Sequence, residues 1–294
     1  MKGFISYYKR KLRIFISKNF EPQILKFEKR RITKLLENKK EIVLIYSIGK
    51  VGSSSVYSSI KSSEVNIPTF HLHSLAPERI EEQKEYYRSG VRNSVPFHLI
   101  QSTAMLEALK SYNGKIYLLT PIREPISREL SSIFQDSFNF SNSKDDLKND
   151  LSSTVNDKVK DLVSELPEYE WFERELKQVF NIDIFDVNFD FDPDQGYLYQ
   201  TYDNLDFCLV RAENLNQSFR DITKKMFGEH NSISLSSANE ASDKFYNTSY
   251  IEIKKEISLD EEQLEKVVNS SFIQKFYPDF ISNIRRKWQR EIHV

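Results

Sequence analysis

The residues with the clearest chemical potential lie in a loop of small side chains near residue 50. The apolar run 42–45 leads into the stretch YSIGKVGSSSVYSSI at residues 46–60. The first turn of a helix offers unpaired N–H groups and the positive end of the helix dipole, and small side chains let a phosphate approach them. A tight strand-to-helix turn that needs glycine only for its backbone is the alternative. The candidate anion-binding residues are Lys50, Val51, Gly52, Ser53, Ser54 and Ser55.

This loop differs from the loop that binds nucleotides together with magnesium. That loop has the pattern G-x-x-x-x-G-K-[ST], in which lysine follows the second glycine and a neighbouring Ser or Thr binds the metal. Here Lys50 lies two residues before Gly52, and Ser53 follows at once. The order is therefore Lys-x-Gly-Ser-Ser, and we expect no metal in the site.

A second group of candidates follows the apolar run KIYLLTPI at residues 115–122. The next residues are REPISRELSSIF, in which Pro125 suits the first turn of a helix. Arg123 is then expected at the carboxyl end of a strand and Ser131 about two turns into the helix, where both could face one ligand. An ion pair between Arg123 and Glu124 or Glu129 is the alternative.

The elements that position these residues alternate between strand and helix. Apolar runs bounded by turn residues alternate with helical patterns, which favours parallel strands with helices on the faces of the sheet. The fold expected is α/β: a P-loop-like three-layer domain with a central parallel sheet flanked by helices. In such sheets ligands bind at the carboxyl ends of the strands. We expect strands at 42–45, 65–75, 95–102, 115–122 and 205–215, and helices directly after the loop near residue 53 and at 77–90, 103–113, 125–134, 141–165, 170–185, 216–228 and 272–288.

Composition favours a soluble globular protein. The chain has 294 residues, of which 39% are hydrophobic and 29% charged, and its 13% aromatic content argues against disorder. The single cysteine, Cys208, excludes an internal disulfide and a cysteine-rich zinc site, which suits a reducing compartment. No apolar stretch is long enough for a signal peptide or a membrane-spanning helix. The expected location is therefore the cytoplasm.

The basic charge is concentrated in one segment. Residues 1–40 hold 13 Lys and Arg against three acids, a net charge of +10, which leaves −11 for residues 41–294. We expect two amphipathic helices broken near Pro22, forming a basic arm (1–40) on an α/β domain (41–294). The arm either packs on the domain or meets anionic lipid at the inner face of the membrane. Nucleic acid is not an expected partner, because the body is acidic and shows no known nucleic-acid module.

Two of these motifs resemble those of sulfotransferases that use 3′-phosphoadenosine 5′-phosphosulfate (PAPS). YSIGKVGSSS is similar to their 5′-phosphosulfate loop, and Arg123 and Ser131 keep the spacing of their 3′-phosphate motif. LVRAENLNQSFRDITKKMFG resembles a later strand-and-helix segment, although Ala212 stands where many members have tyrosine. Within this superfamily the chain looks most like bacterial capsular polysaccharide synthesis proteins, which share GKVGSSS, His-x-His, REPISR and the late FYPDF…KW. The likeness covers about residues 41–290.

The resemblance implies a reaction and roles for its residues. PAPS would be the donor, a hydroxyl or amine of a glycan the acceptor, and no metal would be needed. Lys50 would stabilise the leaving phosphate, and Arg123 and Ser131 would bind the 3′-phosphate. A histidine would act as general base. His98 lies where cytosolic members carry their base, and His73 lies where heparan-type members carry a catalytic glutamate, with His98 ranked first.

Two other classes of function remain open. A P-loop-like kinase or nucleotidase would need a carboxylate that binds magnesium, and the position of Lys50 argues against it. A non-catalytic or differently catalytic factor of polysaccharide synthesis would keep the fold and act through its basic arm. The acceptor itself cannot be deduced from the sequence, because the helices that form acceptor pockets vary between members.

Overall fold

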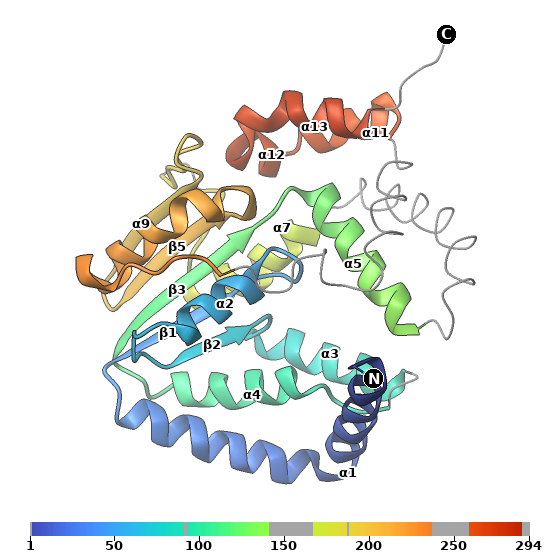
Figure 1. Ribbon diagram of the computed structural model, residues 1–294, viewed down its shortest axis with the longest axis vertical. Helices are drawn as coiled ribbons and strands as arrows, with labels where there is room; N and C mark the ends of the chain where they lie inside the picture. Colours follow the sequence, from blue (N-terminus) through green and yellow to red (C-terminus); the bar gives the residue numbers. More distant parts are fainter. Residues whose placement is uncertain (1, 91–92, 141–166, 187, 237–258, 290–294) are drawn as a thin grey trace.

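A computed structural model describes residues 2–90, 93–140, 167–186, 188–236 and 259–289 (Figure 1). The strands are β1 (Glu41–Tyr46), β2 (Thr69–Leu72), β3 (Lys115–Ile122), β4 (Tyr197–Tyr202) and β5 (Leu205–Arg211). The α-helices are α1 (Lys2–Glu37), α2 (Ser53–Ser62), α3 (Pro77–Ser89), α4 (Phe97–Leu109), α5 (Pro125–Phe140), α7 (Pro167–Trp171), α8 (Gln178–Phe180), α9 (Leu215–Phe227), α11 (Glu261–Val268), α12 (Ser271–Phe276) and α13 (Ile281–Trp288). A π-helix, η1 (Phe172–Lys177), joins α7 to α8, and the 3-10 turns are η2 (Ala212–Asn214), η3 (Glu229–Asn231) and η5 (Pro278–Phe280).

The five strands form one mixed sheet in the order β2-β1-β3-β5-β4. β2, β1, β3 and β5 run parallel, as expected, but β4 runs antiparallel to β5 at the edge. The prediction of a purely parallel sheet is therefore wrong at this edge, and the strand at 197–202 was missed. The reason is local: two residues, Asp203 and Asn204, join β4 to β5, and so short a connection permits only antiparallel pairing.

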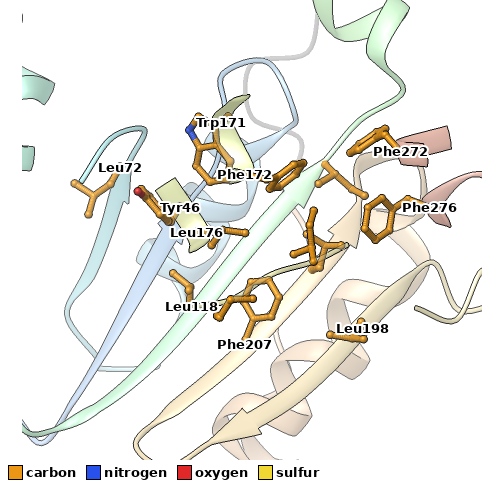
Figure 2. Packing of buried hydrophobic residues seen from close by; sticks show 14 of the residues in the cluster. Tyr46, Leu72, Leu118, Trp171, Phe172, Leu176, Leu198, Phe207, Phe272 and Phe276 are labelled. Carbon is orange, nitrogen blue, oxygen red and sulfur yellow. The ribbon is translucent and has the colours of Figure 1, made fainter. Parts of the chain in front are cut away.

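Helices cover both faces of the sheet, which gives three layers and confirms the α/β class. Alternate residues of each strand point to opposite faces. In β1, Ile42 and Leu44 belong to one buried cluster, whereas Val43 and Ile45 belong to the other. The first cluster includes residues of α1, α4, η1, α12 and α13, and the second includes residues of α2 and α9. Figure 2 shows part of the first cluster, with Tyr46, Leu118, Trp171, Phe207 and Phe272 packed over the sheet.

One predicted strand is a helix. Residues 95–102 were expected to be extended, but α4 starts at Phe97, directly after Pro96. A short apolar run fits a strand or a buried helix equally well by periodicity alone. Here Ile100, Ala104 and Ala108 are buried at the helical spacing i, i+4, i+8. His98 therefore lies in the first turn of a helix.

Other boundaries differ less. β2 is confined to residues 69–72 within the predicted 65–75, whereas β3 and α3 fall where the sequence placed them. The helix predicted at 170–185 is the sequence α7, η1 and α8, and it ends before Asn181, whose backbone is left-handed (φ 55°). The polar helix predicted at 141–165 lies outside the described residues.

The basic arm has two helical stretches that meet at a kink within α1, which confirms the break expected near Pro22. The backbone of α1 leaves the helical region at Phe20 (φ −129°, ψ 20°), two residues before Pro22, which cannot donate a helical hydrogen bond. Beyond the kink, Ile32 and Leu36 are buried in the first core cluster. The second half of α1 is therefore packed on the sheet domain. Within the described ranges, none of the helices has both the length and the apolar character that crossing a lipid bilayer requires.

Candidate functional site

The candidate loops meet where the strand order changes direction. From β1 the chain passes to β2 on one side and then crosses to β3 on the other side of β1. The connections that leave the carboxyl ends of β1 and β3 therefore diverge, and in open α/β sheets ligands bind in the crevice at such a switch point. Lys50 follows β1 and Arg123 follows β3, so both candidates lie at this edge.

The loop after β1 has an unusual backbone. Lys50 (φ 75°) and Gly52 (φ 83°) are both left-handed, and α2 begins at Ser53. Four non-glycine residues in the described chain have positive φ, and three of them are Asn or Asp, which tolerate this conformation. The fourth is Lys50. Strained backbone of this kind is concentrated at functional sites.

The start of α2 offers N–H groups to a ligand. The N–H groups of Ser55 and Val56 already donate to the carbonyl of Gly52 (3.0 and 3.3 Å). Ser53 and Ser54 occupy the first turn, where an N–H group has no helical carbonyl to bond to. Among the three serines, the N–H groups that remain for an anion are therefore those of Ser53 and Ser54.

A direct contact joins the two loops. Nη1 of Arg123 donates to the carbonyl oxygen of Lys50 (3.2 Å). A guanidinium has five N–H donors, so this bond leaves others for a phosphate. Ser131 lies in the second turn of α5 and is partly exposed. That Arg123 and Ser131 share a ligand stays a prediction.

The two acids proposed as alternative partners of Arg123 bond elsewhere. Glu124 accepts from the N–H groups of Ile126 (2.7 Å) and Ser127 (3.0 Å), which starts α5. Glu129 pairs with Arg128 (2.6 Å), which is itself buried and bonded to Glu168 (2.5 Å). Of the two arginines in REPISR, Arg128 therefore has the structural role.

Three histidines gather beside the loop. The ring centroids of His71 and His73 are 4.6 Å apart, and those of His73 and His98 are 6.3 Å apart. Nε2 of His71 lies 2.9 Å from Oγ of Ser53, the first residue of α2. Burial, with the neighbouring His73 and His98, lowers the pKa of His71 to about 3. His71 is therefore neutral near pH 7 and links β2 to the loop.

His73 is oriented by its backbone contacts. Its Nδ1 lies 2.8 Å from the carbonyl oxygen of Ser47. Because a carbonyl only accepts, Nδ1 carries the proton and Nε2 of the neutral ring keeps its lone pair. Burial lowers the pKa of His73, and the charge of Lys50 lowers it further, although the bond to Ser47 acts in the opposite direction. His73 is therefore held as a neutral imidazole near Lys50.

The segment after β2 is held by a buried carboxylate that the sequence did not single out. Glu175, on the π-helix η1, accepts from the N–H groups of Leu75 and Ala76 (2.8 Å each) and from the hydroxyl of Tyr46. Burial raises the pKa of Glu175. Trp171 donates from Nε1 to the carbonyl of His73 (2.9 Å). In the sequence, the sign of a buried Glu175 was its position within the aromatic face of the helix predicted at 170–185.

The C-terminal helices hold the loops after β3 and β5. Nε1 of Trp288 donates to Glu124 (3.2 Å), and the hydroxyl of Tyr277 donates to Glu213 (3.1 Å). Glu213 in turn accepts from the backbone N–H of Glu124 (3.2 Å), and burial raises its pKa. The late aromatic segment therefore supports the residue next to Arg123.

A cavity and a metal site are two further features that a candidate site can include. A cavity of about 510 Å³ lies at the opposite edge of the sheet, beside Lys40 and Lys115 at the amino ends of β1 and β3, so it is not part of this site. In the described part of the chain, no group of three or more His, Cys, Asp or Glu side chains is arranged to hold a metal ion.

Fold and site together define an α/β protein with a loop of small residues, leading from strand to helix, at its switch point. Residues 146–278 match the model of a family described as "Putative capsular polysaccharide synthesis protein". The match includes Glu213 and Tyr277 but neither the loop at residue 50 nor Arg123. It agrees with the expected resemblance to capsular polysaccharide synthesis proteins over this part of the chain. Comparisons with curated proteins and with solved structures gave no match.

Proposed function

We propose that this protein is a sulfotransferase that moves a sulfuryl group from PAPS to a hydroxyl or amine of a glycan, with a capsular or other surface polysaccharide as the acceptor. The observation that carries the proposal is the bond from Arg123 to the carbonyl of Lys50, because it joins the two motifs at one edge of the sheet. The family match of residues 146–278 supports a glycan as the acceptor class.

The residues at this edge suit the donor. When bound, PAPS supplies an activated sulfuryl group attached to a phosphate that departs in the reaction. The first-turn N–H groups of Ser53 and Ser54 suit the 5′-phosphate, since they lie at the positive end of α2. Arg123 and Ser131 suit the 3′-phosphate, because a guanidinium binds phosphate through several N–H groups at once. Space also remains beside the loop, as a Cβ on Gly49 would meet nothing within 4 Å.

Lys50 would act mainly in the transition state. As the bond from sulfur to the leaving phosphate oxygen breaks, negative charge grows on that oxygen, and a nearby ammonium stabilises it. The left-handed backbone of Lys50 fixes where its side chain leaves the loop. The neighbouring N–H groups bind phosphate before and during the reaction and therefore contribute mainly to affinity.

We assign the general base to His73 in preference to His98. The acceptor hydroxyl loses its proton as its oxygen bonds to sulfur, so a neutral imidazole with an available lone pair is needed. The bond to Ser47 and the lowered pKa supply both properties at His73. Loss of transfer in His73→Gln with transfer retained in His98→Gln is the expected result, and the reverse would return the role to His98.

A thermal-shift comparison of the full chain tests the proposal. The ligands are 3′-phosphoadenosine 5′-phosphate (PAP), AMP and ATP, each with and without magnesium. PAP at about 100 times its dissociation constant should raise the free energy of unfolding by about 2.7 kcal/mol. AMP at the same concentration should have a smaller effect, and magnesium should not change the result for PAP.

The other outcomes would each overturn the proposal in a different way. Stabilisation by ATP only with magnesium, and none by PAP, would indicate a kinase or nucleotidase. Stabilisation by none of the three would favour a polysaccharide factor that does not use this donor. The variant Arg123→Ala serves as the comparison with the wild-type protein. It should remove the preference for PAP over AMP and leave the fold intact.

A further inference from the structure

The exposed large hydrophobic side chains of the described chain are gathered in one region. Five lie on α1, one near the end of α3 and one at the start of α4. Ser17 on α1 donates to the carbonyl of Val95, and Arg88 near the end of α3 pairs with Glu21 (2.6 Å), so these elements are neighbours (Figure 1). The exposed side chains are Leu12 (58%), Phe15 (60%), Ile16 (39%), Phe20 (47%), Phe27 (63%), Tyr86 (70%) and Phe97 (51%).

The first half of α1 turns its apolar face away from the protein body. Leu12, Phe15 and Ile16 have the i, i+3, i+4 spacing that places side chains on one face of a helix. Ser17, about 140° from Leu12 around the helix, is buried against the body. In the sequence, the same apolar spacing continues upstream at residues 4, 5 and 8. Before the kink, α1 is therefore an amphipathic helix with an outward apolar face.

The second half of α1 presents positive charge. After the kink, Ile32 and Leu36 face the core, and the exposed side carries basic residues beside the exposed Phe27. Lys26, Arg30 and Lys34 are all exposed and recur at every fourth residue, which aligns them along one side of the helix. The helix therefore combines an exposed apolar stretch with a basic ridge.

This combination is complementary to an anionic lipid surface. Amphipathic helices with large apolar side chains and Lys or Arg lie in the membrane interface, where apolar burial and attraction to anionic lipids act together. The net charge of +10 in residues 1–40, against −11 in the remaining chain, orients the protein with this helix toward negative charge.

We propose that α1 docks this protein on an anionic phospholipid bilayer. Leu12, Phe15 and Ile16 enter the interface, and the basic ridge of Lys26, Arg30 and Lys34 lies against the head groups, a role for this helix that is separate from any chemistry at the loops. The docked helix lies along the surface and does not cross the bilayer.

Vesicle sedimentation with the full chain tests this docking. The vesicles are phosphatidylcholine alone and phosphatidylcholine with phosphatidylglycerol at about 3:1, a surface that carries negative charge. The protein should bind the mixed vesicles and not the neutral ones. Raising the salt concentration from about 0.1 to about 0.5 M should weaken binding, because the Debye length falls.

Three variants separate the contributions. Lys26→Gln with Arg30→Gln and Lys34→Gln should weaken binding about a hundred-fold, since each basic side chain near such a surface contributes about five-fold. Phe15→Ser with Ile16→Ser should also weaken vesicle binding at least ten-fold, because two apolar side chains no longer enter the interface. The control is Lys61→Gln with Lys110→Gln and Lys266→Gln, which removes the same charge from other exposed positions and should leave binding within about three-fold.

Several results would overturn the proposal. Equal binding to neutral and anionic vesicles would show that charge does not drive the docking. An equal loss of vesicle binding in the basic-ridge variant and in its control would show that the effect of charge is not specific to α1. A second copy of the chain is the competing occupant of the apolar face. A dimer in lipid-free solution that Phe15→Ser with Ile16→Ser makes monomeric, with vesicle binding unchanged, would favour that occupant. Circular dichroism checks the fold, and no donor is used, so failure here is independent of the sulfotransferase proposal.

Discussion

Gly52 offers the sharpest test of the loop, because its replacement has two separable costs. Its φ of 83° lies in the left-handed region, where an L-residue costs about 1–2 kcal/mol. A Cβ at this position would also lie 3.2 Å from Cδ1 of Leu215, so that side chain would have to shift by a few tenths of an ångström. Gly52→Ala should therefore lower the free energy of unfolding by about 1.5–3 kcal/mol.

Two other glycines serve as matched controls. Gly228 has φ 89° and nothing within 4 Å of an added Cβ, so Gly228→Ala carries the backbone cost without the steric one. We expect it to cost about 1–2 kcal/mol. Gly49, in the same loop as Gly52, has neither feature. Gly49→Ala should be neutral or stabilise the fold by up to about 1 kcal/mol.

Urea denaturation and titration with PAP together test the prediction. The loss of stability should be largest for Gly52→Ala, smaller for Gly228→Ala and absent for Gly49→Ala. PAP affinity should fall for Gly52→Ala, and further for the bulkier Gly52→Val, but not for Gly228→Ala. If Gly52→Ala and Gly49→Ala have equal stability, the loop does not hold the left-handed backbone. If Gly52→Val binds PAP normally, the loop does not bind the phosphate.

Three further predictions concern the neighbouring residues. Lys50→Ala should bind PAP within a few-fold of wild type and lose about 10²–10³ in sulfuryl transfer, unaffected by EDTA; normal single-turnover transfer would refute its role. Arg123→Ala should reduce the preference for PAP over AMP by about ten- to a hundred-fold, and an unchanged ratio in calorimetry would make Arg123 structural. The pKa of His71, lowered to about 3 from 6.5, means that the unfolded chain binds the proton first, so stability present above pH 6.5 is lost as the pH falls toward 3. By pH 4.5 the loss should be about 2–3 kcal/mol. His71→Gln should flatten this part of the urea-measured pH profile, while the exposed-site control His230→Gln should not; identical profiles for wild type and His71→Gln would contradict it.

The sequence predicted the elements whose signal is local. β3 coincides with the apolar run at 115–122, and α3 lies between Pro77 and Gly90 as expected. The run at 95–102 was misassigned, because a short apolar stretch carries too little periodicity to separate a strand from a buried helix. The edge strand β4 was missed although Asp203 and Asn204 form a short turn before β5, because the alternation of strands and helices elsewhere in the chain favours parallel pairing.

By itself the sequence determined at which strand ends Lys50 and Arg123 lie, and it predicted that they bind an anion, since both inferences use neighbouring residues only. Only the tertiary structure decided what surrounds them. His73, just after β2, meets His98 in the first turn of α4, and Glu124 meets Trp288 across 164 positions of the chain. Such contacts depend on the crossing from β2 to β3 and on how helices pack over the sheet. Periodicity along the chain records which face of an element is buried, but not which distant residue covers it.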